Sequence, residues 1–136
     1  MKKVRINSSE RMITIGDILS FEKTFNIVIP SSLKRLYLKY NGGEVEFSDA
    51  STYDFASIKY GELTLGGLVQ NLIIDENVIP GNFLPFAVTG VGHMITIQMD
   101  SAVNNKIYLF RYDELEPILL ANSLEELLGV TSIDEL

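Results

Sequence analysis

The sequence predicts a single α+β domain over residues 1–136, with about four helices packed against a mainly antiparallel β-sheet. Three observations lead to this class. Apolar residues recur at helical spacing early in the chain and again over residues 64–74. Three predicted strands, two of them with alternating side chains, follow one another between residues 83 and 112, and a capped helix comes after them. Helices, then a meander of strands, then a helix is the order typical of helices packed on an antiparallel sheet.

Residues 15–25 are predicted to form the first helix. Asp17 lies near its start, where a carboxylate interacts favourably with the helix dipole, and Pro30 blocks its continuation. Its apolar residues fall near one face of a 3.6-residue period, and they are Ile15, Ile18, Leu19 and Phe25.

Residues 32–41 form the second predicted helix, for which Ser31 or Ser32 can serve as the N-cap. Polar and basic residues occupy its other faces, as expected of a helix with one side in water. Its apolar stripe has the spacing i, i+3, i+4, i+7 and consists of Leu33, Leu36, Tyr37 and Tyr40.

The segment Asn41-Gly42-Gly43 is predicted to turn the chain out of this helix. Glycine reaches the left-handed conformation that a helix C-cap needs, and asparagine tolerates it better than most residues. The residues that follow alternate, with Val45 and Phe47 on one side and Glu44 and Glu46 on the other. We therefore expect a helix, a reversal and a strand.

The middle of the chain predicts one further helix. Residues 48–61 read as a loop with room for a short strand, and residues 64–74 as a helix capped by Thr64. Gly66 and Gly67 weaken that helix by roughly 1 kcal/mol each relative to alanine. Its apolar residues at i, i+3, i+4, i+7 and i+8 are Leu65, Leu68, Val69, Leu72 and Ile73.

A run of strands follows the turn at residues 79–82. The segments are FLPFAVT, HMITIQM and KIYLFRY at residues 83–89, 93–99 and 106–112, with PILLA at 117–121 as a further short strand. The polar link between the second and third is short enough for an antiparallel pair. Ser123 and Glu126 form a predicted capping box for a helix that Gly129 ends, and Ser132 and Glu135 repeat that spacing.

Composition excludes several classes of function. The chain has no cysteine, which removes thiol catalysis, disulfide frameworks and cysteine-based zinc sites. No signal-peptide pattern and no span of ~18 apolar residues is present, so we expect a cytoplasmic protein. The net charge of −7 argues against direct nucleic-acid binding and favours a basic partner, although negative charge also serves solubility.

A search for catalytic patterns finds none. His93 is the single histidine, and no nucleophile elbow or metal-ligand spacing accompanies it. Gly90-Val91-Gly92 lacks the third glycine of a dinucleotide fingerprint, so a turn or bulge is the simpler reading. Tyr108, Phe110 and Tyr112 share one strand face, where an aromatic core or interface is favoured over RNA stacking because the surrounding segment is not rich in basic residues.

The ordered set of these segments resembles the SUKH superfamily, which includes a yeast cell-wall assembly regulator and many bacterial immunity proteins. The matching segments are FEKTFNIVIPSSLKRLYLKYNGG with Glu22 and Pro30, SIKYGELTL, LPFAVTGVGHMITIQMD, KIYLFRYDE and LANSLEELL, which span about residues 15–129. Two departures occur. The family's turn is often Asp-Gly-Gly-Gly, where this chain has Thr89-Gly90-Val91-Gly92-His93, and its final helix usually carries an aromatic residue at the position of Leu124.

The resemblance implies a SUKH-like domain that binds proteins and is not an enzyme. The leading expectation is an immunity protein that occludes a cognate toxin domain, such as a nuclease, with no metal or cofactor. The alternatives are a regulatory or scaffolding module and, third, a small-ligand or enzymatic domain that uses the Gly90–His93 loop. The candidate contacts are exposed carboxylates that would attract a basic partner, namely Glu44, Glu46, Asp49, Asp54, Asp113, Glu114 and Glu116.

Overall fold

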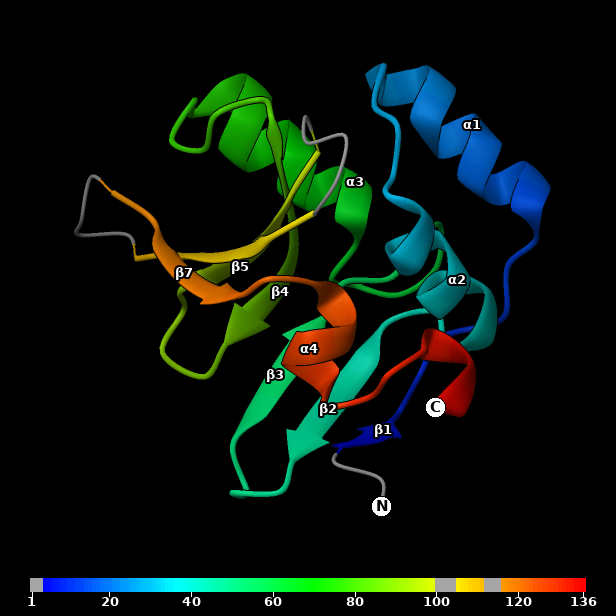
Figure 1. Ribbon diagram of the computed structural model, residues 1–136. Helices are drawn as coiled ribbons and strands as arrows, with labels where there is room; N and C mark the ends of the chain where they lie inside the picture. The colour runs from blue at the N-terminus through cyan, green and yellow to red at the C-terminus, as the bar shows by residue number, and fades with distance from the viewer. Residues whose placement is uncertain (1–3, 100–104, 112–115) are drawn as a thin grey trace.

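The computed structural model describes residues 4–99, 105–111 and 116–136, which contain one seven-stranded antiparallel sheet (Figure 1). Each strand pairs with the next one along the chain, so the sheet is a simple meander. The strands are β1 (Val4–Asn7), β2 (Gly43–Phe47), β3 (Thr52–Phe55), β4 (Phe83–Thr89), β5 (Met94–Gln98), β6 (Ile107–Phe110) and β7 (Ile118–Ala121). The predicted α+β class is confirmed. Strand β1 was not predicted, and β3 lies in the segment read as a loop with room for a strand.

The helices contribute their apolar sides to a core on one face of this sheet. Figure 1 shows α4 in front of β2 and β3 with α2 next to it, α1 above α2 at the upper right, and α3 next to β4. The α-helices are α1 (Ile15–Phe25), α2 (Ser31–Lys39), α3 (Leu65–Leu68) and α4 (Leu124–Leu128). Two further segments form other kinds of helix, the π-helix η1 (Val69–Asp75) and the 3₁₀-helix η2 (Ile133–Glu135).

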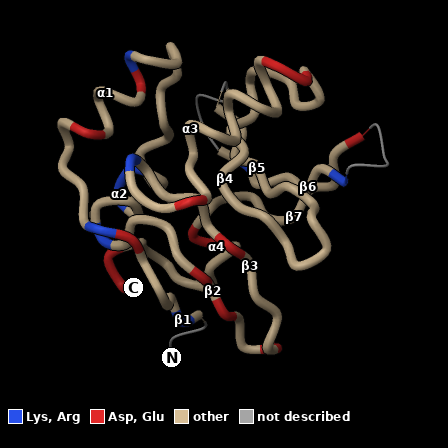
Figure 2. The backbone as a smooth tube through the Cα atoms, turned by 180° about the vertical axis from the view of Figure 1, so that it is seen from behind, with Lys and Arg blue, Asp and Glu red and all other residues tan. Residues whose placement is uncertain are grey.

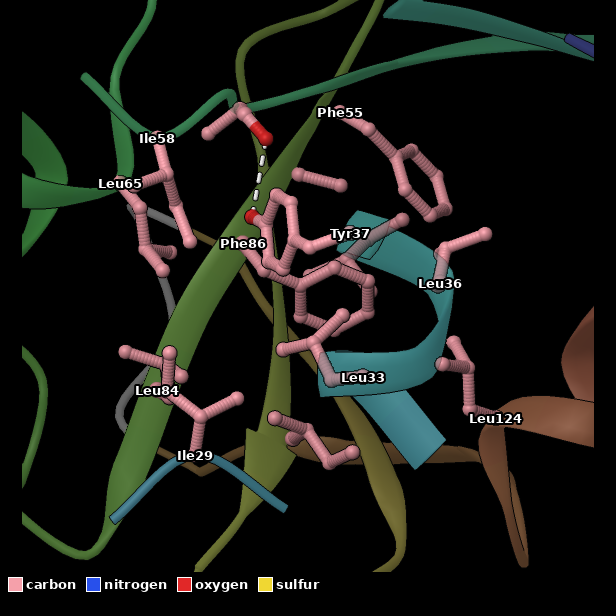
Figure 3. Close-up of a cluster of buried hydrophobic side chains, with 14 of the residues drawn as sticks. Ile29, Leu33, Leu36, Tyr37, Phe55, Ile58, Leu65, Leu84, Phe86 and Leu124 are labelled. Atoms are coloured by element: carbon pink, nitrogen blue, oxygen red, sulfur yellow. Dashed lines mark hydrogen bonds between the residues drawn. The ribbon is translucent and has the colours of Figure 1, made fainter. Parts of the chain in front are cut away.

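The core lies between these helices and the inward-facing side chains of the sheet (Figure 3). A β-bulge between Pro85 and Ala87 inserts Phe86 as an extra residue in β4. Phe86 is therefore buried in the core together with Leu84 and Ala87. The hydroxyl of Tyr37, on α2, donates a hydrogen bond of 2.8 Å to the carbonyl oxygen of Ala56. Burial raises the pKa of this hydroxyl, so it stays protonated and keeps donating.

Helix α1 is rotated relative to the prediction. Its buried residues are Ile18 and Phe21, whereas Ile15 and Leu19 are more than half exposed. The predicted apolar face was therefore wrong for these two residues, because their helical spacing alone does not say which side of the helix the sheet covers. Thr14 caps the helix and forms a capping box with Asp17.

Helix α2 differs from its prediction at both ends. It begins at Ser31 directly after Pro30, and no side chain caps it, so neither Ser31 nor Ser32 is an N-cap. Pro30 occupies the N-cap position with φ of −56° and ψ of 145°. The apolar stripe is confirmed, with Leu33, Leu36 and Tyr37 buried and Tyr40 half-buried.

The Asn41-Gly42-Gly43 segment joins α2 to β2 by close backbone contacts. Helix α2 ends in the extended residue Tyr40, so the glycines turn the chain after the helix and are not its C-cap. Gly42 and Gly43 have φ of +72° and +116°, and a Cβ on Gly43 would lie 2.6 Å from the carbonyl oxygen of Asn7. Only glycine can bring β2 this close to the end of β1.

The predicted helix over residues 64–74 consists of two pieces. Thr64 caps it as predicted, by accepting a hydrogen bond from the backbone N–H of Gly67. After α3 the chain continues as the π-helix η1. The predicted apolar residues still face the core, with Leu65, Leu68 and Val69 buried.

The two late Ser-x-x-Glu patterns cap helices in different ways. Ser123 accepts from the backbone N–H of Glu126, but the Glu126 carboxylate reaches the N–H of Asn122 at 2.6 Å instead of closing the predicted box. The Ser132 and Glu135 pair forms the complete capping box at η2. Gly129 ends α4 in the left-handed conformation, as predicted.

Candidate partner-binding surface

Strands β2 and β3 place three of the predicted acidic residues on the outer face of the sheet. Val45 points into the core, so Glu44 and Glu46 on either side of it point outward. Asp54 is directly opposite Glu44 in the β2–β3 pairing. Seen from behind, acidic positions recur along these two strands, while β4 carries no charged residue (Figure 2).

A shallow cleft of about 340 Å³ lies at the acidic end of this face. Glu44 and Asp54 line it together with Glu10, a carboxylate absent from the predicted set. Glu10 reaches the cleft because its backbone N–H donates to the carbonyl oxygen of Asn41 at 3.0 Å, which brings the segment after β1 across to β2. Its neighbours in the lining are Ser8, Gly43, Phe55, Ser57 and Leu63.

The charge of the cleft carboxylates is not balanced by an ion pair within the part of the chain that the structure describes. Within the described residues, no ion pair involves Glu10, Glu44 or Asp54. Glu44 and Asp54 also face each other across the strands, and directly opposed like charges destabilise a sheet. The cleft is therefore a concentrated negative site open to solvent.

Two other predicted residues have local partners. Glu46 lies 3.8 Å from the guanidinium of Arg5 on β1, and both side chains are well exposed. Asp49 stands in the β2–β3 turn, where its carboxylate accepts hydrogen bonds from the backbone N–H and the hydroxyl of Ser51. These hydrogen bonds lower the pKa of Asp49, and they give it a role in holding the turn.

The second predicted acidic group does not join this surface. Asp113 and Glu114 lie outside the described residues. Glu116 is exposed just before β7, at the opposite edge of the sheet from β1 and β2. The sequence could not separate the two groups, because the number of strands between them depends on the sheet order.

The Gly90–His93 loop forms the tight turn between β4 and β5. The backbone N–H of Thr89 donates to the carbonyl of His93, and the His93 N–H donates to the Thr89 hydroxyl. Gly92 has φ of +88°, which the turn requires. Over residues 4–99, 105–111 and 116–136, no group of three or more His, Asp or Glu side chains could hold a metal ion.

Comparison with known proteins identifies the family. Residues 12–129 match the family model described as "SMI1 / KNR4 family (SUKH-1)". No curated protein matches the chain. In the part of the chain that the structure describes, the helices are too short or too polar to cross a bilayer.

Proposed function

The chain belongs to the SMI1/KNR4 family (SUKH-1), and we propose on this premise that it is an immunity-type protein that neutralises a cognate toxin domain by covering it. The family includes immunity proteins as well as SMI1/KNR4 regulators, and its members are generally not catalysts. Neutralisation by binding requires an exposed complementary surface and no catalytic group.

The observation that carries this proposal is the uncompensated acidic cleft of Glu10, Glu44 and Asp54. Toxins that cleave nucleic acid need a basic surface, because phosphate contacts dominate nucleic-acid affinity. An acidic inhibitor is attracted to such a surface and competes with the substrate for it. A nuclease domain is therefore the partner class that this cleft suits best.

Family membership also supports a second candidate function. A regulator or scaffold of the cell-wall-regulator type would use the same kind of surface for a cellular partner. The third alternative, a small-ligand or enzymatic site at the Gly90–His93 loop, has less support because that loop is held as a hairpin turn.

The test is co-expression of the chain with the product of the neighbouring reading frame. Growth should be rescued, and the two proteins should co-purify as a complex. The double variant Glu44→Lys/Asp54→Lys should lose both effects, whereas Glu76→Lys, a matched charge reversal on an exposed residue next to η1, should retain them. Failure of the wild type to rescue growth or form a complex would contradict immunity and favour the regulatory alternative.

A further inference from the structure

The outer face of the sheet changes from acidic to apolar along one row of paired residues. Asp54 on β3 is opposite Val88 on β4, Val88 is opposite Met94 on β5, and Met94 is opposite Phe110 on β6. Because neighbouring strands lie about 4.8 Å apart, the row from Glu44 to Phe110 is roughly 19 Å long. The acidic cleft and the apolar residues are thus parts of one continuous surface.

Three aromatic rings form the centre of the apolar part. The ring of Phe83 meets Tyr108 at a centroid distance of 5.4 Å and Phe110 at 5.1 Å, both edge to face. Beneath them Thr96 is fully buried, and its hydroxyl donates to the carbonyl of Tyr108. The rings are half-buried, and they are separate from the main core, which lies on the opposite face of the sheet.

This apolar surface extends to the edge of the sheet. Leu119 on β7 is opposite Tyr108, so it shares the outer face, and 48% of it is exposed. The helices pack on the other face, against Ile95, Ile97 and Ile107. Among the described residues, no helix makes more than a minor contact with β6, the strand that carries Tyr108 and Phe110.

We propose that this outer face is the docking surface for the partner and that the partner presents an apolar residue flanked by basic side chains. The apolar residue packs on Phe83, Tyr108 and Phe110, while a lysine or arginine enters the cleft of Glu44 and Asp54. The proposal rests on the proposed function and adds to it where the partner binds and what that surface looks like. Aromatic residues and methionine at the centre with charges at the rim are the composition of protein interfaces.

Charge complementarity selects a basic protein surface as the occupant. The acidic cleft accelerates the approach of a basic partner, and the effect weakens with salt. The aromatic rings then act after encounter, by slowing dissociation. The acidic flank repels nucleic acid, so the rings do not form an RNA-stacking surface.

The test compares variants in their binding to the toxin encoded by the neighbouring reading frame. Phe110→Ser and Leu119→Ser should each weaken binding through faster dissociation, about 30-fold for Phe110→Ser, as for a buried aromatic anchor. Leu119 is nearly half exposed, so its replacement by serine should leave the fold intact. Weaker binding of Leu119→Ser therefore cannot be explained by misfolding. Ile74→Ser is the control of similar exposure, because Ile74 is 54% exposed and lies on η1, outside the strands that carry the aromatic rings, and it should change affinity less than twofold. Glu44→Lys should slow association and flatten its salt dependence.

The possible results separate the two proposals. If the wild type binds and the face variants bind equally well, the docking surface lies elsewhere, and the immunity function stands. If the wild type does not bind the toxin at all, the proposed function fails and this inference falls with it. Sedimentation of the free protein provides the third outcome, because a dimer that Phe110→Ser and Leu119→Ser dissociate would assign this face to a second copy and overturn the proposal.

Discussion

Asn41 connects the end of α2 to the segments that follow β1 and β3 through side-chain hydrogen bonds. It is fully buried, and its amide nitrogen donates to the carbonyl oxygens of Arg11 and Ile58, both at 2.9 Å. Its amide oxygen accepts from the backbone N–H of Ile58 at 2.7 Å. One side chain thus satisfies two buried backbone groups of Ile58 and the partly buried carbonyl of Arg11.

Replacement of Asn41 by alanine should destabilise the protein by about 3 kcal/mol or more. The substitution leaves the two buried backbone groups of Ile58 unpaired, and each costs about 1–3 kcal/mol, with a smaller loss at the partly buried Arg11 carbonyl. Urea unfolding followed by circular dichroism measures the change. The control is Asn71→Ala on the exposed side of η1, for which a change within about 0.5 kcal/mol is expected. Equal stabilities for the two variants would show that the hydrogen bonds of Asn41 are not needed.

Glu22 plays a comparable role at the end of α1. Its carboxylate accepts from the backbone N–H of Ile29 at 2.7 Å and pairs with the ammonium of Lys34 at 3.1 Å. It therefore ties the segment between the first two helices to the start of α2. Glu22 and Asn41, two residues that carry the family resemblance, are architectural in this chain. The acidic residues of the candidate surface, Glu10, Glu44 and Asp54, lie outside the resembling segments.

At the scale of elements, the start of α1 is held by an acid-sensitive cap. The Asp17 carboxylate accepts from the backbone N–H of Thr14 at 3.0 Å and from the ammonium of Lys59 at 3.2 Å. These contacts, with the Thr14 hydrogen bond the larger cause, hold the pKa of Asp17 below its ordinary value of 3.8. The cap thus depends on the ionised carboxylate.

Acidification should weaken the wild type more than Asp17→Asn. A lowered folded-state pKa contributes stability that is complete above the ordinary carboxyl pKa and is lost as the pH falls through the folded value. The free energy of unfolding should therefore fall more steeply below about pH 4 in the wild type than in Asp17→Asn. Urea unfolding across the pH range measures both curves, and Lys59→Met, which removes the second cause, should lie between them. Parallel curves for wild type and Asp17→Asn would contradict the prediction.

Most elements were predictable because their signals are local. The strand at residues 93–99 follows from its alternation, and the helix after Ser123 follows from its cap residues. Strand β1 was not predictable, since its four residues gain their strand conformation by pairing with β2. The exposure of Ile15 and Leu19 was missed for a similar reason, because burial depends on which side of α1 meets the core.

At the scale of the whole molecule, the candidate site depends on strand register. Sequence predicted Glu44 and Asp54 as exposed acids but could not show that they are directly opposite each other. It also missed Glu10, whose position follows from a contact between the segment after β1 and Asn41. Turn position and charge were visible in the sequence, whereas the pairing that concentrates the charge was not.

If the cleft binds a basic partner as proposed, this pairing trades stability for binding. Glu44→Gln removes one charge of the opposed pair, so the free energy of unfolding should rise by about 0.2–1 kcal/mol at low ionic strength, and less at high salt. The same variant should bind the toxin more weakly, because it removes part of the attraction for a basic side chain. Function is often costly to stability in this way.

Glu46→Gln is the matched control for this last prediction. Glu46 lies two residues after Glu44 on β2, on the same face, but it is opposite the uncharged Thr52 and lies 3.8 Å from the guanidinium of Arg5. Its removal relieves no repulsion and loses a weak surface pair, so its unfolding free energy should stay within about 0.5 kcal/mol of the wild type or fall slightly. Chemical denaturation at low and high salt, together with toxin affinity, measures both variants. A Glu44→Gln protein that is less stable than wild type would mean that the carboxylate has a structural partner, and the acidic cleft could no longer be explained by the needs of binding.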